Sequence, residues 1–297
     1  MSEGVNPVER IGAIDIGLQR RELGRTVHDE DTATLAPMRG MKVAFDRPER
    51  APEMGEQVPP GWHHVYFVPT APLAGLGADG LPLDNGVLPE MPLPRRMHAG
   101  NRLTFHSPIL VGEQLRRECE FSGIQLRQGR TGPLIFTVQT RRIYTGRGLA
   151  ITEENTSVFR AQEEPGTKKD PPPGERPPSD APWQRSVKPD PVSLFRYSAL
   201  TFNPHRIHFD RIYARETEGY PGLVVHGMFT GQCLLDLARD QMPDVRIARF
   251  NFRAIAPLFD TSPYQLLGRP APDTKHIDLW AVNPQGTVAM KVDIDYE

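Results

Sequence analysis

Two segments far apart in the chain share one residue pattern, and this repeat constrains the fold more than any other feature. Residues 102–112 read RLTFHSPILVG, and residues 249–260 read RFNFRAIAPLFD. Each has an arginine, a phenylalanine three positions later and then a proline followed by apolar residues, with a longer spacing between the phenylalanine and the proline in the second copy. A further similarity follows in the same order, because GLAI (148–151) and GTVAM (286–290) each precede a strand pattern. Two similarities in one order indicate a duplicated unit.

The residues around the repeats predict a helix and several strands in each half. Residues 222–239 are apolar on nearly every side, as in a helix enclosed by a sheet, and Pro221 and Gly222 mark its start. The helix of the first half is less distinct and is predicted either in 30–45 or around 62–68. Strands are predicted at 101–112, 113–125, 131–145, 148–161, 246–258, 262–270, 275–283 and 286–296. Antiparallel sheets curled around apolar helices predict an α+β fold of the double hot-dog type.

Period-2 alternation supports the strands in both halves. Leu134, Phe136 and Val138 alternate in the first half, and residues 288–294 alternate in the second, as in half-buried strands.

Prolines divide the chain into its predicted domains. Residues 163–191 hold nine prolines in 29 positions, which excludes a helix or an inner strand and predicts an extended linker. The linker separates an N-terminal unit, 1–162, from a C-terminal unit, 192–297. The two units form a pseudo-dimer within one chain, which is either complete or pairs again as a homodimer.

Charge and hydropathy exclude several classes of function. The formal net charge of −2 does not favour nucleic acid or an anionic membrane surface as a partner. No run approaches the roughly 18 apolar residues of a membrane-spanning helix. The N-terminus has no apolar signal core, and the two cysteines, Cys119 and Cys233, are expected to be free thiols. We therefore expect a cytoplasmic protein.

The residues most suited to catalysis lie in the second half. Residues 195–210 read FRYSALTFNPHRIHFD, and residues 219–228 read GYPGLVVHGM. His205 and His208 stand three apart in a short loop, and His226 opens the apolar helix. An imidazole exchanges protons near neutral pH, and free amides at a helix start stabilise an oxyanion. Hydration of a conjugated thioester needs these two features and no metal; the alternative is that the loop histidines merely cap a turn.

These segments resemble the (R)-specific enoyl-CoA hydratases of the MaoC-like group, whose signature is Asp-x-Asn-Pro-[apolar]-His-x-Asp followed by [Ile/Val]-[Ala/Val]-His-Gly-Met. The version in this chain looks like the branch of the hydroxyacyl-thioester dehydratases type 2 and the mesaconyl-C4-CoA (3-methylfumaryl-CoA) and itaconyl-CoA hydratases. The first half agrees in PGWHHVYF (60–67) and LPRRM (93–97), and the resemblance covers about residues 30–297. It implies reversible hydration of an α,β-unsaturated acyl-CoA, with a short or dicarboxylic acyl group.

The resemblance also implies roles for individual residues. His208 falls on the family histidine and is expected to be the general base, and Gly227 falls on the glycine of the oxyanion hole. Asn203 matches the signature, and we expect it in the catalytic loop. Thr201 stands where the family has a catalytic aspartate; it does not ionise near neutral pH, although its hydroxyl can position a water.

The missing carboxylate leaves a second proton-transfer role open. His205, which is inserted relative to the signature, is the first candidate for that role, and Tyr197 is a weaker one. The other inserted residue, Arg206, is predicted to meet a carboxylate of the substrate. Val225 and His226 are predicted to contact the substrate beside the helix start.

Coenzyme A, as part of the substrate, is the only cofactor expected. Arg95, Arg96 and Arg102 are candidates for its phosphates, because arginine binds phosphate with two parallel hydrogen bonds; the alternative is a solvated basic turn. Residues 75–80 match GxGxxG but run into a proline-containing loop rather than a helix, so no dinucleotide site is predicted. The spacing of His205 and His208 lacks the HExxH frame, and no metal is predicted.

Two other functions remain open on the sequence. A hot-dog thioesterase would share the fold, but it normally needs a carboxylate near the helix start, and none precedes Asp236. A non-catalytic acyl-thioester binding protein is the alternative outside enzymes. The sequence also leaves open whether the carrier is coenzyme A or an acyl carrier protein.

Overall fold

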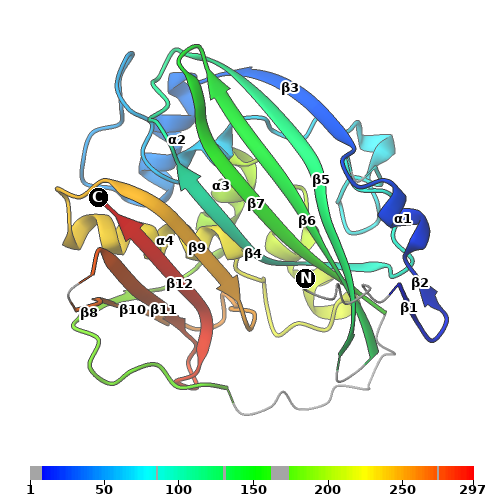
Figure 1. Cartoon of the computed structure of the whole chain (residues 1–297). Helices are drawn as coiled ribbons and strands as arrows, with labels where there is room; N and C mark the ends of the chain where they lie inside the picture. Colours follow the sequence, from blue (N-terminus) through cyan, green and yellow to red (C-terminus); the bar gives the residue numbers. More distant parts are fainter. Residues whose placement is uncertain (1–8, 85, 130–131, 162–173, 273) are drawn as a thin grey trace, which may run out of the picture.

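The structure is a computed structural model in which residues 9–84, 86–129, 132–161, 174–272 and 274–297 are described. Its main feature is an antiparallel sheet of ten strands, in the order β3-β5-β6-β7-β4-β9-β12-β11-β10-β8 (Figure 1). The first half supplies β3 (Thr26–Thr32), β4 (Arg95–Phe105), β5 (Gln114–Gly129), β6 (Gly132–Thr145) and β7 (Gly148–Arg160). The second half supplies β8 (Trp183–Val187), β9 (Ile247–Ala254), β10 (Tyr264–Pro270), β11 (His276–Val282) and β12 (Val288–Tyr296). A hairpin of β1 (Arg10–Ile11) and β2 (Ile14–Asp15) and the short helix α1 (Gly17–Arg21) precede β3.

The strand order confirms the duplicated unit. The sequence β3-β5-β6-β7-β4 is mirrored by β8-β10-β11-β12-β9, and the two copies meet where β4 pairs antiparallel with β9. These central strands carry the repeated motifs, so that Leu103 lies opposite Phe250. A Cβ on Gly100 would lie 2.3 Å from the carbonyl oxygen of Phe252, so only glycine allows this close approach. The eight predicted strands are confirmed, although β4 starts and ends earlier than predicted, and β3 and β8 were not predicted.

The second unit wraps its sheet around α4 (Gly227–Gln241), as predicted for a hot-dog fold (Figure 1). Ten consecutive residues of this helix, Phe229 to Ala238, are buried. The helix begins at Gly227, with His226 as N-cap, and the predicted start at Gly222 is wrong. Residues before Gly227 remain extended because their amides bond to other segments: Val224 N–H donates to Ile207 O, and Val225 N–H donates to Leu258 O.

The first unit has a much shorter helix. α2 (Leu35–Ala44) occupies the first predicted position, and residues Trp62–Val65 form the 3-10 helix η1. A cavity of about 350 Å³ lies against the inner face of β3, β5, β6 and β7 and is also lined by η1. This unit therefore encloses space where the second unit encloses a helix.

The predicted linker contains a strand. β8 pairs with β10 at the outer edge of the sheet, so the sheet of the second unit begins at Trp183. The first part of the linker, 163–173, lies outside the described residues.

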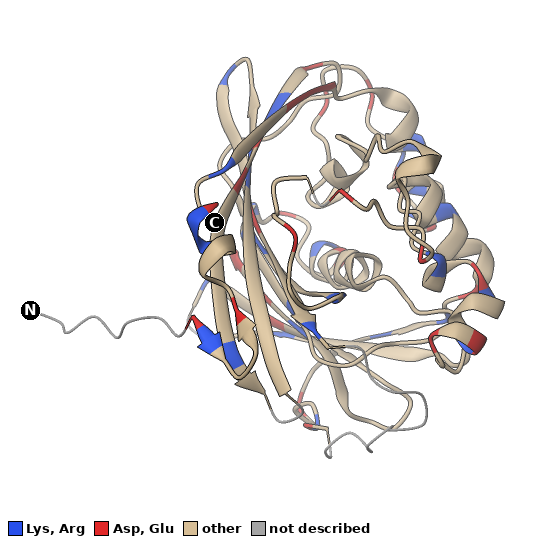
Figure 2. Ribbon diagram, turned by 90° about the vertical axis from the view of Figure 1, so that its right-hand side faces the viewer, with Lys and Arg blue, Asp and Glu red and all other residues tan. Residues whose placement is uncertain are grey.

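Basic and acidic residues are interspersed along the sheet and the helices (Figure 2). Within the described ranges, no helix is long and apolar enough to cross a membrane. Cys119 and Cys233 are buried free thiols.

Candidate active site

The catalytic loop is held between two helices of the second unit. α3 (Pro191–Leu200) begins with a capping box on Asp190 and ends at Thr201. Phe202 then adopts a positive φ of 49°, which turns the chain sharply toward the 3-10 helix η3 (Arg206–His208). The side chain of Asn203 accepts the N–H of His205 at 3.1 Å, so Asn203 shapes the loop. The loop thus returns to the start of α4.

His208 is positioned as a neutral base. Its Nδ1 lies 2.7 Å from the carbonyl oxygen of Val224, which can only accept, so Nδ1 carries the proton and Nε2 keeps a lone pair. The side chain is only 8% exposed. Burial lowers the pKa of His208 to about 3, even though its bond to Val224 acts in the opposite direction. His208 therefore stays unprotonated around neutral pH.

Two further histidines surround His208. The ring of His226 stacks on it with centroids 3.7 Å apart, and the ring of His205 approaches edge-on at 5.4 Å. His226 Nε2 lies 2.8 Å from Ser198 Oγ, while its buried Nδ1 has no hydrogen-bond partner among the described residues. Ser198 was not predicted at the site, because it lies 28 residues before His226 in the chain and no sequence pattern links the two. Tyr197 packs edge-on against His226 at 5.0 Å, and burial raises the pKa of its hydroxyl.

Gly227, the residue predicted for the oxyanion hole, presents its backbone amide at a helix start. It is the first residue of α4, and no acceptor for its N–H is found in the described part of the chain. A Cβ at this position would lie 3.8 Å from His98 Nδ1 and from Met290 Cε. The start of α4 therefore faces a histidine that comes from the first unit.

That histidine belongs to a buried polar cluster that the sequence did not predict. A β-bulge between His98 and Gly100 lies on β4 beside this site. His98 Nε2 bonds to Asn101 Oδ1 at 2.8 Å, and Asn155 Nδ2 donates to the same oxygen at 2.8 Å. Asn101 Nδ2 donates to Glu153 Oε1 and also lies 3.5 Å from the sulfur of Met228. The only signal in the sequence was polar residues recurring at every second position of predicted strands.

The cavity of the first unit opens toward the catalytic loop. Thr201 lines it together with Gln139, Arg141 and Glu153 from the inner face of β6 and β7. Thr201 Oγ1 donates its hydrogen to Tyr197 O at 2.8 Å, so its lone pairs remain as acceptors. Hence residues of both units line this cavity.

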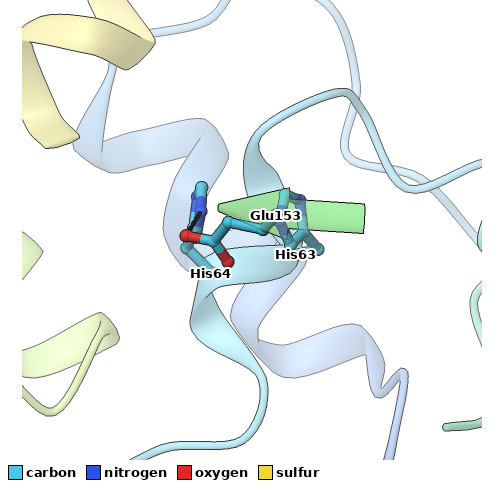
Figure 3. A group of neighbouring side chains, drawn as sticks. All are labelled: His63, His64 and Glu153. Atoms are coloured by element: carbon cyan, nitrogen blue, oxygen red, sulfur yellow. Dashed lines mark ion pairs between the residues drawn. The ribbon is translucent and has the colours of Figure 1, made fainter. Parts of the chain in front are cut away.

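Three side chains at this cavity have the character of metal ligands. The ligand atoms of His63, His64 and Glu153 lie within 4.8 Å of one another (Figure 3). Glu153 Oε1, however, already accepts a hydrogen bond from Asn101 and lies 3.4 Å from the guanidinium of Arg141. A cation bound to Glu153 would face that guanidinium, which disfavours a metal ion at these three side chains.

The arginines predicted for coenzyme A lie in different surroundings. Arg95 bonds to the hydroxyl of Tyr220 at 3.0 Å, and Arg102 pairs with Glu154 at 2.7 Å on the exposed face of β4. Arg96 donates to Ser157 Oγ and is largely buried, which lowers its pKa to about 10. The structure does not bring the three together into one cluster through the contacts described, and binding of coenzyme A by them stays a prediction.

Arg206 is engaged away from the cavity. Its guanidinium bonds to Asp210 at 2.7 Å and to the carbonyl oxygen of Ala78 at 2.9 Å, and it stacks over Tyr213. The predicted contact with a substrate carboxylate is not supported by this arrangement, because the guanidinium of Arg206 is already paired with the carboxylate of Asp210. Val225, also predicted to contact substrate, is buried beneath the helix start.

The buried histidines predict a loss of stability in mild acid. Burial lowers the pKa of His63, His98, His205, His208 and His226. The unfolded chain therefore binds more protons below the ordinary histidine pKa of about 6.5, so the stabilisation is complete above that pH and is lost below it. For the three least exposed, we expect the free energy of unfolding to fall by about 1 kcal/mol each between pH 6.5 and 5.5. Urea unfolding at these pH values measures the change, and a shallower slope is expected for His63→Gln; equal stability at both pH values would contradict the prediction.

Comparison with known proteins gives the family and the fold of the chain. The family model of hydroxyacyl-thioester dehydratase type 2 matches residues 61–260. Mesaconyl-C(4)-CoA hydratase of Chloroflexus aurantiacus is 44% identical over 274 residues, covering 92% of this chain and 96% of that protein. The crystal structure of HtdX from Mycobacterium tuberculosis has a TM-score of 0.63 at 19% identity, covering 92% of this chain and 100% of that chain. A second protein of that organism, with a double hot-dog fold, has a TM-score of 0.55 at 13% identity and covers 93% and 96%. The predicted fold is confirmed, and the chain belongs to the hydroxyacyl-thioester dehydratase type 2 family.

Proposed function

We propose that this chain is a hydro-lyase that reversibly adds water to an enoyl-CoA thioester, and that its substrate carries a carboxylate on the acyl group. The observation that carries the activity is the position of His208. Its Nε2 is unprotonated, and its ring stacks on that of His226, the residue that precedes Gly227 in the chain. A base beside an oxyanion-binding amide is what conjugate addition of water requires.

The proposed steps use residues of the second unit. His208 Nε2 accepts a proton from water while the water oxygen bonds to C3 of the acyl group. The π pair of the C2–C3 bond then forms the C1–C2 double bond of an enolate, the carbonyl π pair moves to the thioester oxygen, and the N–H of Gly227 stabilises that oxyanion. The proton then passes from His208 to C2, and the neighbouring ring of His205 is proposed to relay it. The lone pairs of Thr201 are available to orient the water.

Two observations support a carboxylated acyl group. The C. aurantiacus relative is named for mesaconyl-C4-CoA, an enoyl thioester with a carboxylate on C3. The cavity beside Thr201 is lined by histidines, Gln139, Arg141 and Glu153 rather than by a continuous apolar surface. A long alkyl chain would leave these polar groups desolvated without partners, which is costly. A short polar acyl group fits the cavity better.

A substrate screen tests the proposal. The purified chain is mixed with crotonyl-CoA, itaconyl-CoA or mesaconyl-C4-CoA, and the absorbance of the conjugated thioester is followed. We expect its loss, most rapidly with a carboxylated substrate, and formation of the 3-hydroxyacyl-CoA by mass spectrometry. Release of free coenzyme A thiol without hydration would indicate the thioesterase instead. Binding without any turnover would indicate a non-catalytic acyl-thioester binding protein.

Thioesterase chemistry has less support in the geometry. The first carboxylate of α4, Asp236, is buried and bonded to Arg239 at 2.8 Å, so it is not directed at the helix start. Our proposal includes a cytoplasmic location, supported by the free thiols of Cys119 and Cys233. It also treats the pseudo-dimer as the catalytic unit, because residues of both halves meet at Gly227.

A further inference from the structure

Arg141 is the cation that the cavity presents to an acyl group. It lies on the inner face of β6, between Gln139 and Ile143, which also line the cavity. About 26% of its side-chain surface remains accessible, although β6 lies between β5 and β7 inside the sheet. Since Arg141 lines the cavity, that surface is available to a group bound there.

The guanidinium of Arg141 is held loosely by its neighbours. It lies 3.4 Å from Glu153 Oε1 and 3.3 Å from Gln139 Oε1. Charge-assisted bonds of arginine are normally about 2.7–2.9 Å long. The next residue, Arg142, shows the usual geometry on the opposite face of β6, with bonds of 2.9 Å to Glu118 and 2.9 Å to Glu120. Arg141 therefore keeps donors free for a tighter anionic partner.

A chain of contacts joins Arg141 to the oxyanion-binding amide. Glu153 contacts Arg141 and accepts a hydrogen bond from Asn101, and Asn101 Nδ2 lies 3.5 Å from the sulfur of Met228, the second residue of α4. Thr201, in the catalytic loop, lines the same cavity as Arg141. The cavity and the start of α4 are thus joined by this chain of contacts, and Thr201 belongs both to the loop that carries His208 and to the cavity lining.

The arginine predicted from the sequence for this role has other partners. Arg206 is bonded to Asp210 and Ala78 and does not line the cavity. Arg117 does line it, but it is paired with Asp29 at 2.6 Å. Of the two arginines that line the cavity, Arg141 has the longer bonds to its partners, so its N–H groups are the ones available to a bound anion.

We propose that Arg141, positioned by Gln139 and Glu153, binds the distal carboxylate of the acyl group and makes the first unit the specificity determinant of the enzyme. This rests on the proposed hydration activity of the second unit. The guanidinium and the carboxylate form a planar pair with two parallel hydrogen bonds. Glu153 keeps the guanidinium in place, and the remaining N–H donors of Arg141 favour a dicarboxylic monothioester over a neutral acyl group.

The test compares two substrates in the full-length protein. Kinetics are measured with mesaconyl-C4-CoA and with crotonyl-CoA, which lacks the carboxylate, for wild type, Arg141→Met and Arg141→Lys. Because Arg141→Met leaves Glu153 buried without its cation, the double variant Arg141→Met/Glu153→Gln removes both charges together and guards against misfolding. Arg142→Gln, on the outer face of the same strand, is the matched control.

We expect kcat/KM for mesaconyl-C4-CoA to fall roughly 100-fold in Arg141→Met and in the double variant, with crotonyl-CoA changed less than about threefold. Arg141→Lys should recover part of the loss, and Arg142→Gln should match wild type with both substrates. Equal losses with both substrates in a folded variant, or no loss with the carboxylated one, would overturn the proposal. A wild type that hydrates neither substrate would instead overturn the proposed function, so the two failures are distinguishable.

Discussion

His208→Ala should lower kcat for enoyl-CoA hydration by roughly 10³-fold, the usual contribution of a positioned general base. The reason is geometric: the Nδ1–H bond to the Val224 carbonyl leaves Nε2 as the lone pair that accepts the proton of water. Loss of the conjugated thioester absorbance measures the rate. The ring also stacks on His226, so thermal unfolding should accompany the assay to show that the variant is folded.

An exposed histidine supplies the control for this variant. His28 lies on β3 with an exposed side chain, and His28→Ala should keep wild-type activity. The pH dependence adds a second readout: since the pKa of His208 is lowered to about 3, its protonation should not reduce kcat/KM between pH 8 and 6. A variant that keeps most of its hydration rate would exclude His208 as the base.

Arg47→Met should lower the free energy of unfolding by about 3–5 kcal/mol, as expected when one partner of a buried ionic network is removed. Arg47 is 7% exposed and bonds to Asp240 at 2.6 and 3.0 Å and to Glu49 at 2.8 Å. It also lies 3.9 Å from the buried Asp236, whose pKa is raised by burial. Because Asp236 and Asp240 belong to α4, this loss should loosen the helix that presents Gly227.

Urea unfolding measures this effect, with Arg50→Met as the matched control. Arg50 pairs with Glu56, but its side chain is 62% exposed, so its removal should change stability by less than about 1 kcal/mol. Similar stability of the two variants would show that the network around Arg47 contributes nothing beyond an exposed ion pair.

The histidine-rich loop could be picked out from the sequence because it is local: His205 and His208 stand three residues apart in one turn. The roles of His208 and Gly227 came from the resemblance and stay predictions, and the exact start of the helix was missed. The partners that tune these groups were not predictable. The Val224 carbonyl and the Ser198 hydroxyl approach the histidines only because separate segments fold back on one another.

The strand pattern shows the same limit in the first unit. Leu134, Phe136 and Val138 alternate as expected of a strand, yet they form the less buried face of β6, while Gln139 and Arg141 face the cavity. In the second unit, Met290, Val292 and Ile294 are buried in the core that contains α4, as the pattern suggests, while Val288, beyond a bulge in the ladder, belongs to a separate cluster. The period of a strand is a local property of the chain, but the side that faces inward depends on what the sheet encloses.

The sequence by itself determined the duplicated hot-dog unit, the approximate positions of eight strands and the apolar helix around which the second sheet is wrapped. These follow from periodicity, turn residues and short spacings, which operate within a few residues of each other. Only the tertiary structure decided that the first unit holds a polar cavity lined by Arg141 and that His98 of this unit lies at the start of α4. The physical reason is that β4 and β9 pair at the centre of one sheet, which brings residues more than a hundred positions apart to the same helix start.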